Sequence, residues 1–227
     1  MSNEALLADA LVLLKDFRAE VPGFKEDFRN EVIKELEGAL RAANNKANGK
    51  SRLEAAAKTI LKSAKKVKNP ALHGAWVAPN GKQYVCDNAT LMEIDDPIEL
   101  EPLPDNVKQF QTDIIMAARN TSDMEFDLPP LAELKSQIAE QKAKAKSEGR
   151  KKYIIVYCFG NGLAIEAERL LNAIKATDAN VLRTTDSRNK DGNIIASCFV
   201  KGNGATILLL PMRVGDGYLD TIGCIVL

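Results

Sequence analysis

The chain has 227 residues, of which 45% are hydrophobic and 27% charged, and its 31 basic and 31 acidic residues give a net charge of zero. This composition predicts an ordinary buried core in one large domain or in one domain with an extension, and it excludes a uniformly basic protein that coats DNA. The apolar runs are shorter than the roughly 18 residues of a membrane span, and the N-terminus has no signal-peptide cleavage site. We therefore expect a cytoplasmic protein with no membrane partner.

Residues 1–48 predict a helical hairpin that precedes the main domain. Apolar side chains recur at helical spacing in residues 3–19, and the same pattern returns in residues 25–44. The connection "EVPGF" is short, so we expect the two helices to be antiparallel neighbours. The sequence "NNKANGK" then ends the second helix, because asparagine and glycine favour helix ends and turns.

Residues 51–67 predict a third helix with an apolar stripe on one side and lysines on the other. Nine basic residues and one acidic residue lie between Arg41 and Leu72. Two interpretations stay open for this basic face, a solvated helix surface or a surface that contacts the phosphates of DNA. In the second case the candidate DNA-binding residues are Arg52, Lys58, Lys62, Lys65 and Lys66.

The middle of the chain changes from helix to strands and turns. A Pro-Asn-Gly turn between apolar runs predicts a hairpin within residues 72–94. Residues 86–105 are acidic and contain three prolines, which predicts an extended connector on the surface. Its Asp95-Asp96 pair lies in a proline-rich run, so we expect no metal site there. Residues 105–150 predict a largely helical insertion with helices at 106–121 and 129–150.

The last third predicts a buried strand at "KKYIIVYCF", an amphipathic helix at residues 163–177 and three further strands, "NVLRTTDS", "GNIIASCFV" and "GATILLLPM". The short connections between the last strands predict an antiparallel sheet. The glycines of "FGNG" could form a phosphate-binding loop, but the third glycine of the dinucleotide pattern and a Gly-Lys-Ser/Thr sequence are both missing. We interpret them as a sharp turn from strand to helix.

Cysteine and histidine usage limits the chemistry that the chain can perform. The cysteines at 86, 158, 198 and 224 contain no Cys-x-x-Cys pair, and His73 is the single histidine. This excludes a zinc site of the usual Cys/His spacing and most Ser-His-Asp or Cys-His catalytic schemes. We therefore expect no catalytic activity, no metal and no cofactor.

Residues 51–94 and 163–212 follow the same order, a helix and then an antiparallel meander. The fold class predicted for residues 49–227 is therefore α+β, with a duplicated α-plus-three-strand unit. We expect the two helices to pack side by side on one face of an antiparallel sheet, related by approximate two-fold symmetry.

Several of these stretches resemble the bacterial beta sliding clamp, the ring that tethers the replicative polymerase to DNA. The ending "ATILLLPMRV" is similar to that family's last strand, which runs into Met-Pro-Met-Arg-Leu. The helix "ERLLNAIKAT" and the stretch "NPALHGAWVAPNGKQYVCDNATLMEI" resemble other parts of a clamp domain, with Cys86-Asp87-Asn88 where Thr-Asp-Gly would stand. A clamp subunit carries three such domains, whereas this chain has room for one, and residues 1–48 and 105–150 have no counterpart in the family.

The resemblance implies a role for the Pro-Met-Arg ending. In the family this ending lines an apolar groove in which short motifs of polymerases and repair proteins dock. The residues at the matching positions are Leu210, Pro211, Met212 and Arg213. The alternative is structural, since proline ends a strand and methionine often fills a core.

Two functions follow from the sequence. The first is a non-enzymatic, sliding-clamp-like module that binds duplex DNA through its basic helix and the peptide motifs of DNA-processing proteins through its groove. The alternative is a scaffolding protein that assembles as a homo-oligomer through its N-terminal helices.

Overall fold

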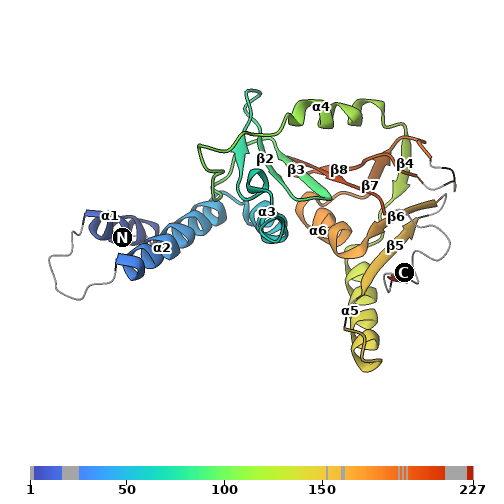
Figure 1. The fold of residues 1–227 in the computed structure, drawn as a ribbon, viewed down its shortest axis with the longest axis horizontal. Helices are drawn as coiled ribbons and strands as arrows, with labels where there is room; N and C mark the ends of the chain where they lie inside the picture. Colours follow the sequence, from blue (N-terminus) through green and yellow to red (C-terminus); the bar gives the residue numbers. More distant parts are fainter. Residues whose placement is uncertain are drawn as a thin grey trace.

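The computed structural model describes residues 3–16, 26–151, 153–159, 162–188, 190, 192, 194–212 and 224–226. These residues form an α+β structure built on a seven-stranded antiparallel sheet, with helices on both faces of the sheet (Figure 1). The predicted fold class is confirmed.

The seven strands lie in the spatial order β1-β2-β3-β9-β8-β7-β4, and each is antiparallel to its neighbours. Short turns connect β1 to β2, β2 to β3 and β8 to β9, where glycine and asparagine predicted them. The connection from β7 to β8 spans residues 185–197 and is longer than the short connection predicted there. The strands are β1 (Trp76–Val77), β2 (Gln83–Cys86), β3 (Thr90–Ile94), β4 (Met124–Asp127), β7 (Val181–Thr184), β8 (Cys198–Gly202) and β9 (Ala205–Leu209).

The sheet is made of two similar units that meet at its centre. Helix α3 (Ser51–Ala64) precedes β1, β2 and β3, and helix α6 (Ala167–Thr177) precedes β7, β8 and β9. The last strands of the two units, β3 and β9, pair antiparallel with Met92 opposite Ile207. Two units that meet through antiparallel copies of the same strand are related by an approximate two-fold axis between those strands, which confirms the predicted duplication.

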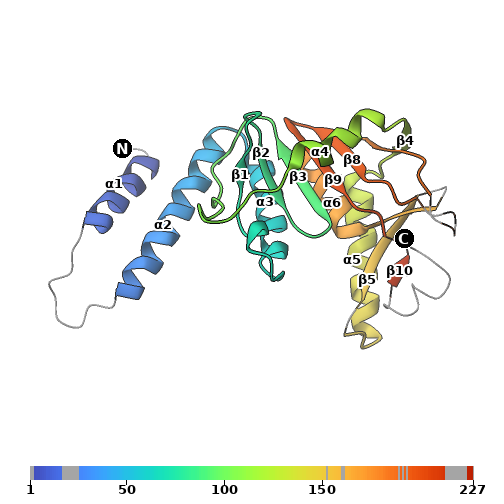
Figure 2. The same ribbon diagram turned by 45° about the horizontal axis from the view of Figure 1, so that its top comes forward.

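Helices α3 and α6 lie side by side on one face of this sheet (Figures 1 and 2). We call it the helix-covered face, and the opposite one the outer face. Side chains alternate along a strand, so Met92 and Ile207 enter the main core under the helices. Their neighbours Leu91 and Leu208 enter a smaller apolar cluster around Trp76 on the outer face.

The segment 105–150 is largely helical, but it also contributes a strand. It contains α4 (Thr112–Ala117), the 3-10 helix η2 (Ala118–Thr121), β4 and α5 (Leu131–Ser147). Strand β4 extends the main sheet by pairing with β7, and the sequence pattern did not predict this strand within the largely helical segment. Helix α4 crosses the outer face, whereas α5 packs beside α6 and projects away from the sheet (Figure 1).

A second sheet of three strands lies beside α6, in the order β10-β5-β6. Its strands are β5 (Ile154–Phe159), β6 (Leu163–Glu166) and β10 (Cys224–Val226). The predicted helix at 163–177 is therefore wrong at its start, and the glycine turn joins two strands. Leu163, Ala164 and Ile165 are buried in succession, and an extended segment can bury consecutive residues on both of its faces.

The N-terminal residues form the predicted hairpin of α1 (Asn3–Asp16) and α2 (Glu26–Ala47). A 2.7 Å ion pair joins Lys15 of α1 to Glu37 of α2. The hairpin stands to one side of the sheet (Figures 1 and 2), and Asn45 fastens its end by exchanging two hydrogen bonds with the backbone of Glu99. Among the helices that the structure describes, none is both long and apolar enough to cross a membrane.

Candidate functional site

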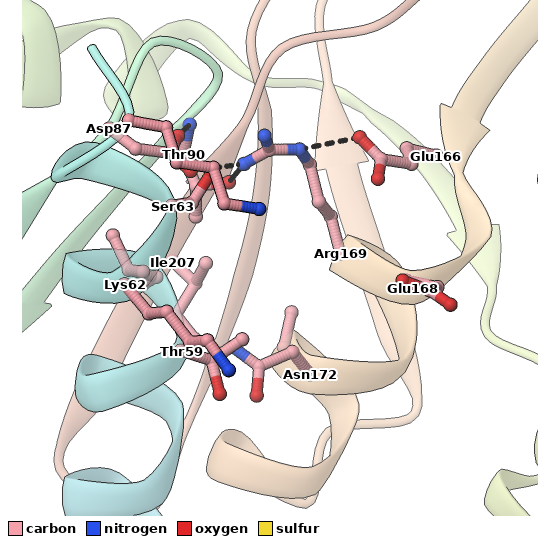
Figure 3. A pocket seen from close by; sticks show the side chains of 13 residues that line it. Thr59, Lys62, Ser63, Asp87, Thr90, Glu166, Glu168, Arg169, Asn172 and Ile207 are labelled. Carbon is pink, nitrogen blue, oxygen red and sulfur yellow. Dashed lines mark hydrogen bonds and ion pairs between the residues drawn. The ribbon is translucent and has the colours of Figure 1, made fainter. Parts of the chain in front are cut away.

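A groove of about 250 Å³ lies between α3 and α6, on the helix-covered face of the sheet (Figure 3). Thr59, Lys62 and Ser63 line it from α3, and Arg169 and Asn172 line it from α6. The two helices expose these polar side chains because their apolar stripes are turned toward the sheet. The groove therefore combines polar and charged side chains with apolar ones such as Ile60 and Ile207, and its walls come from both units of the fold.

Arg169 is the central residue of this groove. Its Nη1 donates to Asp87 Oδ2 at 2.6 Å and to Thr90 Oγ1 at 2.7 Å, and its Nε donates to Glu166 Oε2 at 2.7 Å. Asp87 is buried, and its Oδ1 accepts hydrogen bonds from the backbone N–H groups of Ala89 and Thr90. Arg169 therefore ties the β2–β3 turn of the first unit to α6 of the second.

The structure divides the five predicted DNA-binding residues into two groups. Lys62 and Lys66 are exposed at the groove, and neither has an ion pair with another described residue. The other three face carboxylates. Arg52 lies 3.6 Å from Asp178, Lys58 lies 2.5 Å from Glu54, and Lys65 lies 2.7 Å from Glu101.

These ion pairs reduce the unbalanced positive charge on the basic face of α3. The hydrogen bond from Lys65 holds the pKa of Glu101 below its usual range, so this pair stays ionised. A lysine beside a carboxylate has less unbalanced charge to offer a phosphate. Helix periodicity predicts which side of α3 faces solvent, but the carboxylates opposite it come from segments distant in the sequence, apart from Glu54.

A second hollow, an apolar pocket of about 350 Å³, lies on the outer face. We call it the Leu210 pocket. Trp76, Leu91 and Leu208 form part of its wall, and Phe110 lies with its ring 6.2 Å from the Trp76 ring. Leu210 follows the last residue of β9 and is 44% exposed at this pocket.

The four predicted partner-binding residues have different positions. Leu210 lines the apolar pocket, as just described. Pro211 and Met212 are half-buried and do not line it, because the chain leaves the main sheet here and the Met212 N–H donates to the carbonyl of Ala164 in β6. Arg213 lies outside the described residues.

The outer face also holds a buried carboxylate that the sequence analysis did not single out. Glu93 accepts hydrogen bonds from Lys82 Nζ at 2.8 Å, Tyr84 Oη at 2.8 Å and Arg119 Nη1 at 2.5 Å. Burial acts to raise the pKa of Glu93, but these three hydrogen bonds outweigh it and hold the pKa below its usual range. Glu93 therefore stays charged and anchors η2, through Arg119, to the centre of the sheet.

The remaining candidates for chemistry are protected thiols. Burial raises the pKa of Cys86 and Cys198 to about 12, so both remain protonated near neutral pH. Among the described residues, no group of three or more His, Cys, Asp or Glu side chains could hold a metal ion. Comparison with known protein families, with curated proteins and with solved structures gives no match.

Proposed function

We propose that the chain is a non-enzymatic, sliding-clamp-like module that holds partner proteins at duplex DNA. The observation that carries this proposal is the pair of hollows on opposite faces of one sheet. The groove with Lys62 and Lys66 lies between the paired helices, and the Leu210 pocket lies on the outer face. The two hollows adjoin at the β2–β3 turn, where Asp87 and Thr90 line both, so DNA and a peptide would bind on either side of this turn.

DNA contact is assigned to Lys62 and Lys66, because neither forms an ion pair with a described residue, whereas the carboxylates that line the groove, Asp87, Glu166 and Glu168, pair with Arg169 and Lys142. Each phosphate that a lysine neutralises changes the slope of log affinity against log salt by about 0.9 on duplex DNA. The double variant Lys62→Gln/Lys66→Gln should therefore flatten the slope by up to about 2 units. Duplex DNA is titrated at several salt concentrations against both proteins.

The matched control removes the same charge elsewhere. Lys144 and Lys146 are exposed near the end of α5, away from the groove. We expect the variant Lys144→Gln/Lys146→Gln to keep the wild-type slope. Equal slopes for all three proteins would end the assignment of DNA to this groove.

Peptide docking is assigned to the Leu210 pocket, whose wall is mostly apolar. A peptide with leucine and phenylalanine anchors should bind there, because burying one such side chain contributes about 1.5–3 kcal/mol. Leu210→Asp should weaken binding of a fluorescent peptide of this kind by about tenfold or more. Leu131→Asp, an exposed leucine on α5, is the control. Peptide binding that is equally strong in both variants would contradict the assignment.

A second candidate function is a scaffold that assembles through the N-terminal hairpin, and the exposure of that hairpin favours it. Leu6, Val12, Leu13 and Phe28 are all more than half exposed, and no described side chain of α1 is buried. A helix of 14 residues is marginal in water on its own, so α1 depends on packing for its stability. Covering its exposed apolar side chains with a further surface would therefore stabilise the hairpin.

A second copy of the same hairpin fits this need. Leu6 and Leu13 are one heptad apart, so they lie on the same side of α1 and can pack against the same residues of a second hairpin. Two antiparallel hairpins would form a four-helix bundle, and the hairpin stands clear of the main sheet (Figure 2).

Light scattering after size exclusion tests this candidate. We expect a dimer for the wild type, a monomer for Leu6→Glu/Leu13→Glu, and an unchanged dimer for the control Leu131→Glu. A wild type that stays monomeric at high protein concentration rules the candidate out.

A further inference from the structure

A third hollow lies on the outer face beside the Trp76 cluster, with which it shares Phe199. It has a volume of about 620 Å³ and is lined by η2, by the α6–β7 connection and by strands β7, β8 and β9. We call it the basic basin. The sheet register places its floor residues on the outer face, because Lys201 lies opposite Thr206 and Arg183 lies opposite Phe199.

Three cations from three different elements line the basic basin. Arg119 comes from η2, Arg183 from β7 and Lys201 from β8, and no described aspartate or glutamate is part of the lining. Arg119 donates one guanidinium N–H to the buried Glu93, which also accepts hydrogen bonds from Lys82 and Tyr84. Lys82 also pairs with Asp95, so Arg119 belongs to a cluster of two cations and two carboxylates.

The other two cations are less constrained. Arg183 pairs at 2.6 Å with Glu125 on the neighbouring strand, but both side chains are more than half exposed, so water screens this pair. Lys201 is exposed and has no ion pair with any other residue that the structure describes. The basin therefore carries the unpaired charge of Lys201 beside two arginines whose carboxylate partners, Glu93 and Glu125, are not part of its lining.

Thr206 provides an independent sign of a ligand. It lies on β9 between Glu93 and Lys201, and its side chain is buried. Its hydroxyl has no hydrogen-bond partner among the described residues. Buried polar groups are nearly always paired, and an unpaired one needs an explanation. A hydroxyl at the floor of a cationic basin can donate to the oxygen of an anion.

We propose that the basic basin binds an organic phosphate of about the size of a nucleotide, with the phosphate held by Arg119, Arg183, Lys201 and the Thr206 hydroxyl. Arginine matches phosphate geometry through paired N–H donors. The volume lies in the range of small-molecule sites and exceeds the space that a bare phosphate fills. The side-chain amides of Asn120 and Asn180, which also line the basin, can hydrogen-bond the organic part of the ligand.

This site is independent of the proposed clamp-like function. It lies on the face of the sheet opposite Lys62 and Lys66, so loss of DNA binding and loss of phosphate binding can be observed separately. The same phosphate chemistry occurs in free nucleotides and at the 5′ end of a nucleic acid, and the two sources need separate probes.

Isothermal titration of the full chain tests the proposal with ATP, adenosine, inorganic phosphate and a 5′-phosphorylated oligonucleotide. ATP should bind more tightly than inorganic phosphate, and adenosine should not bind. Arg183→Gln/Lys201→Gln should weaken ATP at least about tenfold, since charge-assisted hydrogen bonds are lost. Lys62→Gln/Lys66→Gln, which removes two charges from the other face, should leave the ATP affinity unchanged.

The two phosphate sources give different results. Binding of ATP in preference to the oligonucleotide assigns the basin to free nucleotides, and the reverse preference assigns it to nucleic-acid ends. Absence of binding by all phosphate probes, or equal losses in the two double variants, would overturn the proposal.

Thr206→Val separates a ligand-binding role from a structural one. The substitution removes a hydroxyl that has no partner, so Tm should stay the same or rise. The ATP affinity should nevertheless fall several-fold, because the donor to the phosphate is gone. A variant with lower Tm and wild-type ATP affinity would overturn the placement of the phosphate on this hydroxyl.

Discussion

The two faces of the main sheet differ in how they use alternate residues of the same strands. Met92 and Ile207 enter a continuous apolar core under α3 and α6 on the helix-covered face. One residue further along, Glu93 and Leu208 face a smaller apolar cluster, a buried ion network and two hollows on the outer face. One row of side chains therefore stabilises the fold, and the other row leaves room for ligands.

The largest effect should come from the core of the helix-covered face. Ile207→Ala removes a fully buried side chain where β9 meets β3, and we expect a loss of about 2–5 kcal/mol in the free energy of unfolding, measured with urea. Leu208→Ala is the matched variant on the outer face. It should cost less, because Leu208 packs in the smaller apolar cluster of the outer face, beside the Leu210 pocket, where neighbouring side chains have room to shift into the space. Equal losses would contradict the division between the faces.

A smaller effect is expected from the buried ion network. Glu93→Gln keeps the size of the side chain but removes the charge that Lys82 and Arg119 contact, so we expect a loss of about 1.5–3 kcal/mol in unfolding free energy. Glu125→Gln removes the same charge from the exposed pair with Arg183 and should cost less than about 1 kcal/mol. Similar losses would show that burial does not strengthen the Glu93 network.

The same carboxylate should make stability depend on pH. The pKa of Glu93 is lower in the folded protein than in the unfolded chain, so its contribution is complete above the unfolded value of about 4.3. The contribution is lost as the pH falls through the lower folded pKa. Unfolding free energies measured between about pH 6 and pH 3 should decline less steeply in Glu93→Gln than in the wild type. Parallel curves for the two proteins would show that Glu93 does not contribute to the loss of stability at low pH.

The smallest effect on stability is expected at the groove lysines. Lys62→Gln/Lys66→Gln changes exposed side chains without a described ion pair, so the free energy of unfolding should change by no more than about 0.5 kcal/mol per substitution. Urea denaturation measures this change. A larger loss would mean that the two lysines contribute to folding stability, and the weaker DNA binding of the variant would then reflect partial unfolding.

Local patterns predicted much of the fold. The apolar stripe of α3 and the Pro-Asn-Gly turn before β2 are set within a few residues, so periodicity and turn chemistry located them. The repeated order of helix and meander then predicted that α3 and α6 share one face of the sheet. Leu163–Glu166 was harder, because a short apolar run fits either a strand or a buried helix. Pairing with β5 decided that it became β6.

The sequence by itself determined the α+β class, the duplicated unit and the apolar strand that ends just before Leu210. The tertiary structure decided which charges remain available, since Arg52 and Lys65 meet Asp178 and Glu101 whereas Lys62 and Lys66 face the groove. It also decided that Arg169 meets Asp87 and that η2, β7 and β8 place three cations around one basin. Periodicity shows which side of an element is buried, but the partner across a groove comes from a distant segment that only the folded chain brings near.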